Sequence, residues 1–294
     1  VVTLTAQTTT DGPINIREFD SLVINTVTEF SANRVATDAT TSISDSTVAA
    51  QSDVRTAGMG DLIIRSVGAI TLNGGLSDTF ADTALSASGS GNILVKVLAI
   101  NGDILANAAI RSGSGDISLL AGRGITLAVT ADITVSSGSG TIDLNAAGGS
   151  ITQSADLTAK TAGGNILFHA RDNIRLGTAD ARSAGEQSTW GTVAVIASTG
   201  AIEDSKVRAA EATNIFGANA YLIAAGSIGI LGAGLANPLE TEVLTLAAQT
   251  IQGGDINITE LTGLTVDTVA SFSVNRVAAD ATTDTSSTTN AALS

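Results

Sequence analysis

Residues 91–167 decide the fold, and they read GNILVKVLAINGDILANAAIRSGSGDISLLAGRGITLAVTADITVSSGSGTIDLNAAGGSITQSADLTAKTAGGNIL. Apolar residues occupy alternate positions in short runs, and glycine or small polar residues separate the runs. An alternation of period two indicates a β-strand with one face buried and the other exposed. Glycine at the boundaries permits the positive φ angles that tight corners require. This stretch therefore predicts many short strands separated by corners.

A phrase of glycine, a polar residue and isoleucine repeats within this stretch. It begins at Gly91, Gly115, Gly140 and Gly164, at intervals of 24, 25 and 24 residues. Strands that recur at such a period stack on their counterparts, one circuit above the last. We therefore predict an all-β fold, a right-handed parallel β-helix (β-solenoid) with about three short strands per circuit of roughly 24 residues.

A longer repeat contains the shorter one. The first 52 residues align without gaps with the last 52 at an offset of 242 positions, and 29 of the pairs are identical. FSANRVATDATT of residues 30–41, for example, returns as FSVNRVAADATT of residues 272–283. We predict that residues 1–242 form one complete long repeat and that residues 243–294 begin the next. Ten regular circuits would rise roughly 48 Å.

Three segments interrupt the regular pattern. Residues 31–53 are rich in Ser, Thr, Ala and Asp, and we predict a lateral excursion or weak strands there, with a flexible linker as the alternative. Residues 76–89 are predicted to be a loop inserted before Gly91, and residues 181–190 a wider circuit. A string of immunoglobulin-like sandwiches is the rival fold, but each unit of about 100 residues would need a buried Trp and a Tyr corner. The whole chain has one Trp and one Tyr.

The composition excludes several classes of function. The chain carries 28 acidic and 14 basic residues, a formal net charge of −14, which repels nucleic acid and anionic lipid. It has no cysteine for disulfides or metal sites, and no unbroken apolar run of the roughly 18 residues that a membrane span needs. The opening VVTLTAQTTT has neither Met nor the pattern of a signal peptide, so we expect the chain to belong to a longer polypeptide.

The phrases GDISLLAGRGITL (residues 115–127), GSITQSADLTAKTAGGNIL (149–167) and ARDNIRLGTADAR (170–182) resemble a known family. They are similar to the β-helical repeats of large bacterial exoproteins, the filamentous haemagglutinin-like adhesins, over roughly residues 60–258. The resemblance implies giant secreted fibres that bind cells, surfaces or each other. The amino-terminal secretion domain typical of that family is absent from this sequence, which leaves the export route open.

Catalytic residues are hard to assemble from this sequence, so we predict that the chain is not an enzyme. Its only histidine, His169, is expected on the outer face of a strand as a solvated side chain. The closest acidic pair, Glu203 and Asp204, is followed by Lys206 and Arg208, but strand alternation should point the two carboxylates to opposite faces. We predict no cofactor, although incidental calcium at acidic corners is left open.

Five residues are candidates for contacts with a partner or at the repeat junction. Asn33 and Arg34 recur as Asn275 and Arg276 within the phrase NRVA, which suggests a shared role. A corner Asn, or an Arg that pairs with the acidic surface of the neighbouring unit, would fit. Trp190 lies in an irregular run, where it is expected to cover the end of an apolar layer or to anchor a partner or a sugar.

The function expected from the sequence is structural. We predict a segment of a giant extracellular or cell-surface fibre, adhesin, appendage or sheath, in which tandem β-solenoid repeats stack end to end, within one polypeptide or as head-to-tail subunits. The expected partners are the chain itself and possible cell-surface or glycan receptors, with no nucleic acid and no membrane insertion. The alternative is a carbohydrate-active β-helical enzyme, a polysaccharide lyase or hydrolase, which would need a groove lined by several acidic and basic side chains.

Overall fold

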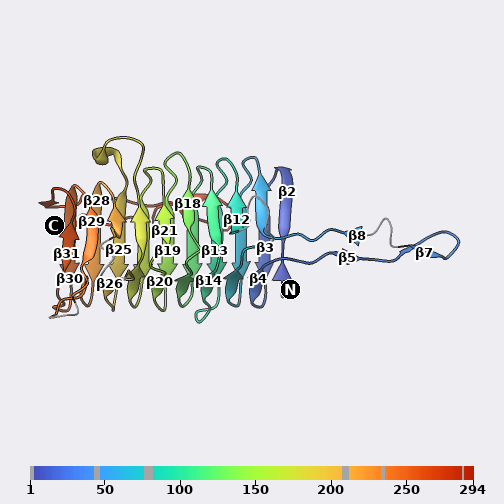
Figure 1. The fold of residues 1–294 in the computed structure, drawn as a ribbon, viewed down its shortest axis with the longest axis horizontal. Helices are drawn as coiled ribbons and strands as arrows, with labels where there is room; N and C mark the ends of the chain where they lie inside the picture. Colours follow the sequence, from blue (N-terminus) through green and yellow to red (C-terminus); the bar gives the residue numbers. More distant parts are fainter. Residues whose placement is uncertain (1–2, 43–46, 76–81, 207–211, 233–235, 287) are drawn as a thin grey trace.

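The chain is wound into a parallel β-helix with three sheets (Figure 1). The computed structural model describes residues 3–42, 47–75, 82–206, 212–232, 236–286 and 288–294. Each circuit contributes about one strand to each sheet, and every pairing between circuits is parallel. The predicted fold class, a β-solenoid of about three strands per circuit, is confirmed.

The strands fall into three long sheets, named A, B and C. Sheet A consists of β1 (Thr3–Leu4), β4 (Leu22–Ile24), β11 (Ile70–Leu72), β14 (Ile104–Ala106), β17 (Ile125–Leu127), β20 (Ile151–Gln153), β23 (Ile174–Leu176) and β26 (Ile202–Asp204). Sheet B consists of β2 (Ala6–Asp11), β9 (Val54–Ala57), β12 (Thr83–Ala87), β15 (Ala109–Ser112), β18 (Ile133–Val135), β21 (Thr158–Lys160), β24 (Thr178–Asp180), β27 (Ile215–Phe216), β29 (Leu239–Glu242) and β31 (Ile258–Glu260). Sheet C consists of β3 (Ile14–Glu18), β10 (Leu62–Ser66), β13 (Ile93–Val97), β16 (Ile117–Ala121), β19 (Ile142–Ala146), β22 (Ile166–Ala170), β25 (Thr192–Ala197), β28 (Asn219–Ala224), β30 (Thr245–Thr250) and β32 (Thr265–Val266).

The isoleucine of the repeated phrase builds the core. Ile93, Ile117, Ile142 and Ile166 are register partners in successive strands of sheet C, and each is fully buried. Each such side chain stabilises the coil by about 1.5–3 kcal/mol relative to an exposed one. The three sheets thus close around one continuous apolar column.

The glycine of the phrase is required because the circuits approach closely at this corner. A Cβ at Gly115 would overlap the carbonyl oxygen of Gly91, and one at Gly140 would overlap that of Gly115. None of these three glycines adopts a positive φ, so the constraint is steric rather than conformational. Repeated glycine at this position therefore follows from the stacking distance between circuits.

At several circuits the polar residue at this corner forms a hydrogen bond to the next circuit. The side-chain oxygen of Asp61 accepts the backbone N–H of Asn92 at 2.7 Å, Asn92 accepts that of Asp116 at 2.8 Å, and Asp116 accepts that of Thr141 at 2.7 Å. Asn165 accepts the N–H of Thr192 in the same way at 2.8 Å. These side chains form a polar ladder along one corner of the solenoid.

The predicted loop at residues 76–89 is wrong for the part that is described. Residues 76–81 lie outside the described residues, but β12 (Thr83–Ala87) is a strand of sheet B that pairs with β9 and β15. Ala84 and Leu85 are fully buried. Small side chains concealed the alternation there. Residues 181–190 do form a wide corner, which includes the 3-10 turn η1 (Gln187–Thr189).

The solenoid has fewer circuits per long repeat than the ten expected. In the described part of residues 1–242, sheet C has eight strands, from β3 to β28. Residues 27–42 and 47–51 leave the coil, and the corners between strands differ in length. From β1 in sheet A to its counterpart in β30 of sheet C the chain makes eight and two-thirds circuits, a rise of roughly 42 Å.

The two copies of the long repeat occupy different sheets. Residues 3–4 lie in sheet A and their counterparts 245–246 in sheet C; residues 16–18 lie in sheet C and 258–260 in sheet B. Residues 23–24 lie in sheet A and 265–266 in sheet C. Along the chain the strands visit C, A and B in that order, so the second copy is set back by one face of the three-sided coil.

Two antiparallel hairpins leave the solenoid, and the strand pairing of their described residues is similar. The N-terminal hairpin (residues 27–51) contains β5 (Phe30–Ser31), β6 (Arg34–Val35), β7 (Thr41–Ser42) and β8 (Thr47–Val48), and the C-terminal hairpin (residues 269–293) contains β33 (Arg276–Val277) and β34 (Thr283–Asp284). Pair for pair, their bridges differ by 242 residues: Arg34 pairs with Ser42 as Arg276 pairs with Asp284. Even the positive φ at the tip recurs, 64° at Ala39 and 67° at Ala281.

Candidate interaction site

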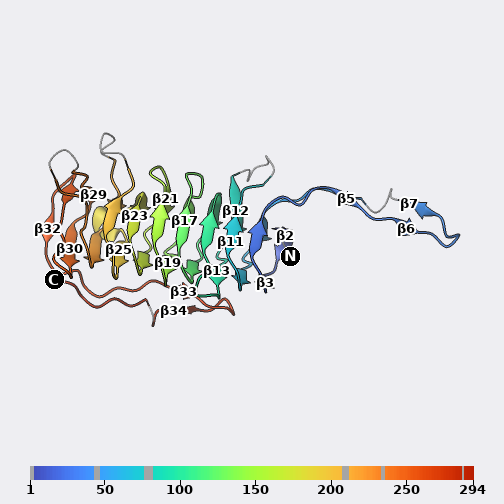
Figure 2. The ribbon, with the colours of Figure 1, turned by 90° about the horizontal axis from the view of Figure 1, so that it is seen from below.

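The C-terminal hairpin lies along the outer face of sheet C (Figure 2). Its base packs near Tyr221 and Ala247, and its tip reaches Asn92 and Ile63. The hairpin therefore runs back along the solenoid axis towards the amino-terminal circuits. We call the strip of sheet C beneath it the docking face.

An ion pair fixes the middle of the hairpin. The Arg276 guanidinium donates to both carboxylate oxygens of Asp143, with Nε–Oδ2 at 2.6 Å and Nη2–Oδ1 at 3.1 Å. Asp143 is fully buried, and the Arg276 side chain is 22% exposed. Burial raises the pKa of the Asp143 carboxyl, an effect that the hydrogen bond and positive charge of Arg276 oppose. A bidentate pair of this kind fixes orientation as well as proximity.

The polar ladder holds the hairpin on one edge. Asn275 donates from its backbone N–H to the Thr141 hydroxyl at 2.8 Å and from its side-chain amide to Asp116 at 3.2 Å. The side-chain amide of Asn165 donates to the carbonyl of Ser273 at 2.9 Å. Asp116 and Asn165 thus accept from the next circuit with one side-chain atom and bind the hairpin with another.

Apolar contacts complete the docking face at both ends. Towards the base, Val274 and Val269 pack with Leu167 and Tyr221, and the Tyr221 and Phe272 rings meet edge to face at 5.3 Å. Towards the tip, Val277 packs against Ile63 and Leu94, and its N–H donates to the Ser118 hydroxyl at 2.9 Å. The large apolar side chains Ile63, Leu94 and Leu167 on the outer face of sheet C are therefore covered rather than exposed.

Of the five predicted contact residues, two lie in this site. Asn275 and Arg276 make its central polar contacts, and their partners belong to the preceding long repeat. Asn33 and Arg34 occupy the same positions in the N-terminal hairpin, where both are exposed. Trp190 follows η1 in the wide corner; its indole N–H donates to the carbonyl of Gly185 at 3.1 Å.

Asp143 and Ser118 are site residues that sequence reasoning missed. Both occupy the outward position of sheet C that holds Leu94 and Leu167 in neighbouring circuits. The outward-facing column of sheet C thus holds two polar residues between leucines, whereas the inward-facing column beside it contains no polar residue in the described strands. This contrast is the sequence signal that marks the position. Periodicity within one strand does not reveal it, because it becomes visible only when the circuits are aligned.

His169 is on the outer face, as predicted, but half-buried rather than fully solvated. Its Nε2 lies 3.1 Å from the Ser198 hydroxyl and its Nδ1 lies 3.4 Å from the Asn145 side-chain nitrogen. Burial lowers the pKa of this imidazole, the charge of Arg276 lowers it further, and Asp143 opposes both. These effects favour the neutral form of the imidazole relative to that of an exposed histidine.

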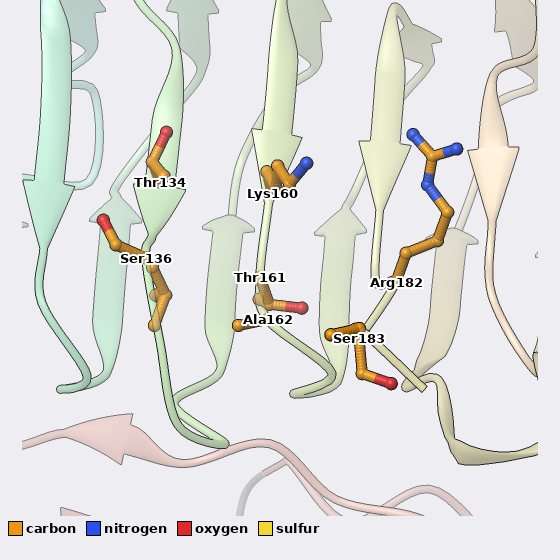
Figure 3. A pocket seen from close by; sticks show the side chains of 9 residues that line it. Thr134, Ser136, Lys160, Thr161, Ala162, Arg182 and Ser183 are labelled. Carbon is orange, nitrogen blue, oxygen red and sulfur yellow. The ribbon is translucent and has the colours of Figure 1, made fainter. Parts of the chain in front are cut away.

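A shallow hollow of about 570 Å³ lies on the outer side of sheet B (Figure 3). Lys160 and Arg182 line it, and both pair with the buried carboxylate of Asp180, at 3.3 Å and 2.9 Å. Burial raises the pKa of Asp180, but the Arg182 hydrogen bonds outweigh this and leave the pKa below its ordinary value. Arg182 also stacks on the Phe216 ring at 3.9 Å. Among the described residues that line this hollow there is no carboxylate.

The acidic pair considered for catalysis is divided between two environments. Asp204 is buried and accepts from the side-chain amides of Asn214 at 2.6 Å and Asn237 at 3.0 Å. Glu203 points outwards, 3.7 Å from Arg175. The expectation that the two carboxylates face opposite ways is confirmed, and Arg208 lies outside the described residues.

Within the described ranges, no cluster of three or more His, Cys, Asp or Glu side chains is placed to hold a metal ion. No helix in the same part of the chain is long and apolar enough to cross a membrane. Comparison with protein-family models, with curated protein sequences and with solved structures finds no match to this chain.

Proposed function

We propose that the chain is a structural segment of an extracellular fibre in which tandem long repeats stack along one solenoid axis. The observation that carries this proposal is the contact across the repeat boundary. Residues from the second long repeat, Asn275 and Arg276, are bound to Asp116 and Asp143 of the first. The second repeat thus stabilises the first by covering its outer face as well as by continuing its coil.

The composition of the surface is consistent with this role. Among the described residues, polar side chains form hydrogen bonds between successive circuits and between hairpin and coil, where they stabilise the array. The net charge of −14 keeps a long, apolar-rich assembly soluble through mutual repulsion. We propose attachment to cells, surfaces or glycans only as a use of such a fibre.

Electron microscopy of the native material tests the proposal. We expect long, thin filaments with an axial rise of roughly 42 Å per long repeat, the rise of eight and two-thirds circuits. Finding only compact, separate particles in native preparations at every concentration would contradict it. A repeat distance that is not a multiple of the expected rise would show that the long repeats do not share one axis.

A carbohydrate-active enzyme is the second candidate, and the hollow beside Lys160 and Arg182 is the observation that favours it. Two cations over an open hollow suit an acidic polysaccharide. Activity would be sought by incubating the full chain with a panel of acidic polysaccharides and measuring chain length and new unsaturated ends. Turnover that is abolished by Lys160→Ala would support this candidate over a purely structural role.

A further inference from the structure

We propose that the N-terminal hairpin is a clasp that docks on the docking face of another long repeat, as the C-terminal hairpin docks within this chain. The partner is a second copy of the solenoid, and its acceptor residues are those equivalent to Asp116, Ser118 and Asp143. This inference rests on the proposed tandem stacking and adds to it a specific lateral contact between repeats.

The first support is that the hairpin occurs twice in this chain, once docked on the solenoid and once projecting away from it. The two hairpins share their strand register and their tip hydrogen bonds: Ala36 N–H to Thr40 carbonyl is 2.9 Å, and Ala278 N–H to Thr282 carbonyl is 2.8 Å. In the described residues, the strand pairing and the tip of the hairpin are therefore the same with and without a solenoid beside it. It is preformed for docking, which reduces the entropy lost on binding.

The second support is the exposure of the contact residues in the free state. Val277 is 1% exposed in the docked hairpin, whereas its counterpart Val35 is 67% exposed. Phe30, the counterpart of Phe272, is 54% exposed. Apolar side chains that are buried in one copy and exposed in the other indicate that the second copy has a surface to cover.

The third support is direction. Both hairpins point along the solenoid axis towards the amino-terminal side of their own coil (Figures 1 and 2). The C-terminal hairpin consequently overlies the preceding repeat, and the N-terminal hairpin projects past β1 and β2 into the space where a preceding repeat would lie.

The fourth support is the rotation between repeats. The N-terminal hairpin leaves the coil after β4 in sheet A, whereas the C-terminal one leaves after β32 in sheet C. Because the second copy is set back by one face, sheet A of one repeat continues sheet C of the repeat before it. The N-terminal hairpin is therefore aligned with sheet C of a preceding repeat, the sheet that carries the docking face.

Disulfide trapping tests the clasp, because the chain has no cysteine of its own. A full-length donor carries Val35→Cys, and a full-length acceptor carries Ser118→Cys together with Arg276→Ala, which loosens its own hairpin. We expect a donor–acceptor disulfide under mild oxidation. Val277→Cys with Ser118→Cys in one chain should cross-link internally and calibrates the chemistry.

The matched control acceptor carries Thr126→Cys, an exposed position of β17 in sheet A, in place of Ser118→Cys. At least a tenfold lower yield is expected from it. Equal yields from Ser118→Cys and Thr126→Cys, or no donor–acceptor disulfide while the internal control forms, would overturn the clasp.

A charge exchange provides an independent measurement. Asp143→Arg in the acceptor repels its own Arg276 and also Arg34 of any copy, whereas a donor with Arg34→Asp fits the new charge. Sedimentation velocity should detect one-to-one complexes only when these two variants are mixed, after circular dichroism has shown that both retain the β fold. Failure of the charge-exchanged pair to associate would contradict the assignment of Arg34 to this position.

The two proposals fail separately. If filaments form but the Val35–Ser118 cross-link does not, the fibre proposal is supported and the clasp proposal is contradicted. If copies cross-link but never form filaments, the clasp proposal is supported and the fibre proposal is contradicted.

Discussion

Arg276 is the residue on which docking of the C-terminal hairpin depends most. Removing one member of a buried ion pair leaves the other charged and desolvated, a change that costs about 3–5 kcal/mol if the surroundings stay closed. Lifting the hairpin lets water reach Asp143, and we expect the Arg276→Ala variant to take this route. Thermolysin digestion followed by mass spectrometry should then show rapid cleavage within residues 269–293.

Arg34→Ala is the matched control, since the same residue type in the same hairpin register is exposed. We expect it to leave cleavage of residues 269–293 unchanged. Protection of that segment in both variants would show that apolar contacts alone hold the hairpin.

His169 reports on the same contact through its pKa. Burial and the charge of Arg276 both lower this pKa in the docked state. A lowered histidine pKa means that protonation opposes docking, so this contribution to stability is present above the ordinary pKa of about 6.5 and is lost as the pH falls through the lowered value. Because the chain has a single histidine, one NMR signal can be followed without assignment.

We expect the His169 pKa to rise towards its ordinary value in the Arg276→Ala variant, because both lowering effects weaken when the hairpin lifts. The Arg34→Ala variant should titrate like the unmodified chain. An identical titration in all three proteins would show that the hairpin does not cover His169.

At the scale of single elements, the repeated phrase shows why the coil could be predicted. Glycine, polar residue and isoleucine each meet a separate demand, namely close approach, hydrogen bonding to the next circuit and core packing. Because these requirements recur in every circuit, the residues that meet them recur at a regular interval in the sequence. Thr83–Ala87 meets the same packing requirement with small side chains and lacks the phrase, and for that reason its sequence does not reveal a strand.

The docking face could not be predicted in the same way. Arg276 and Asp143 are 133 residues apart, and nothing periodic relates them. Their contact depends on the direction in which the hairpin leaves the coil, which is set by the face that the last strand occupies. The retention of Asn and Arg in both copies pointed to a shared role, but the acceptor became visible only in three dimensions.

The corner glycines lead to a prediction about single circuits. In Gly115→Ala the new methyl group meets the carbonyl oxygen of Gly91, so the circuits must separate locally. We expect a loss of about 1–3 kcal/mol in the free energy of unfolding, comparable to overpacking a core. Chemical denaturation followed by circular dichroism measures this loss.

Gly12→Ala is the appropriate control. Gly12 occupies the equivalent corner of an early circuit, where a Cβ would have no neighbour nearer than 3.9 Å, and its φ is not positive. That variant should be neutral or more stable by up to about 1 kcal/mol, because alanine restricts the unfolded chain. Equal destabilisation by both substitutions would mean that backbone conformation, not the spacing of circuits, selects glycine.

At the scale of the whole molecule, the two kinds of charge act in opposite directions. The net charge of −14 opposes the approach of a second copy over long distances, whereas the Arg–Asp contact acts only after docking and is sheltered from solvent. The Debye length falls from about 30 Å at 0.01 M salt to about 8 Å at 0.15 M, so salt weakens the repulsion far more than the buried pair.

Association between copies should therefore strengthen with salt. For the mixed Arg34→Asp and Asp143→Arg variants, we expect the association constant to rise at least about tenfold between 0.01 M and 0.15 M NaCl, a change equivalent to about 1.4 kcal/mol, and then to level off. Sedimentation velocity across a salt series measures this. A constant that falls steadily with salt would mean that exposed ion pairs dominate the contact, in which case Arg34 would not be buried against its partner as Arg276 is against Asp143.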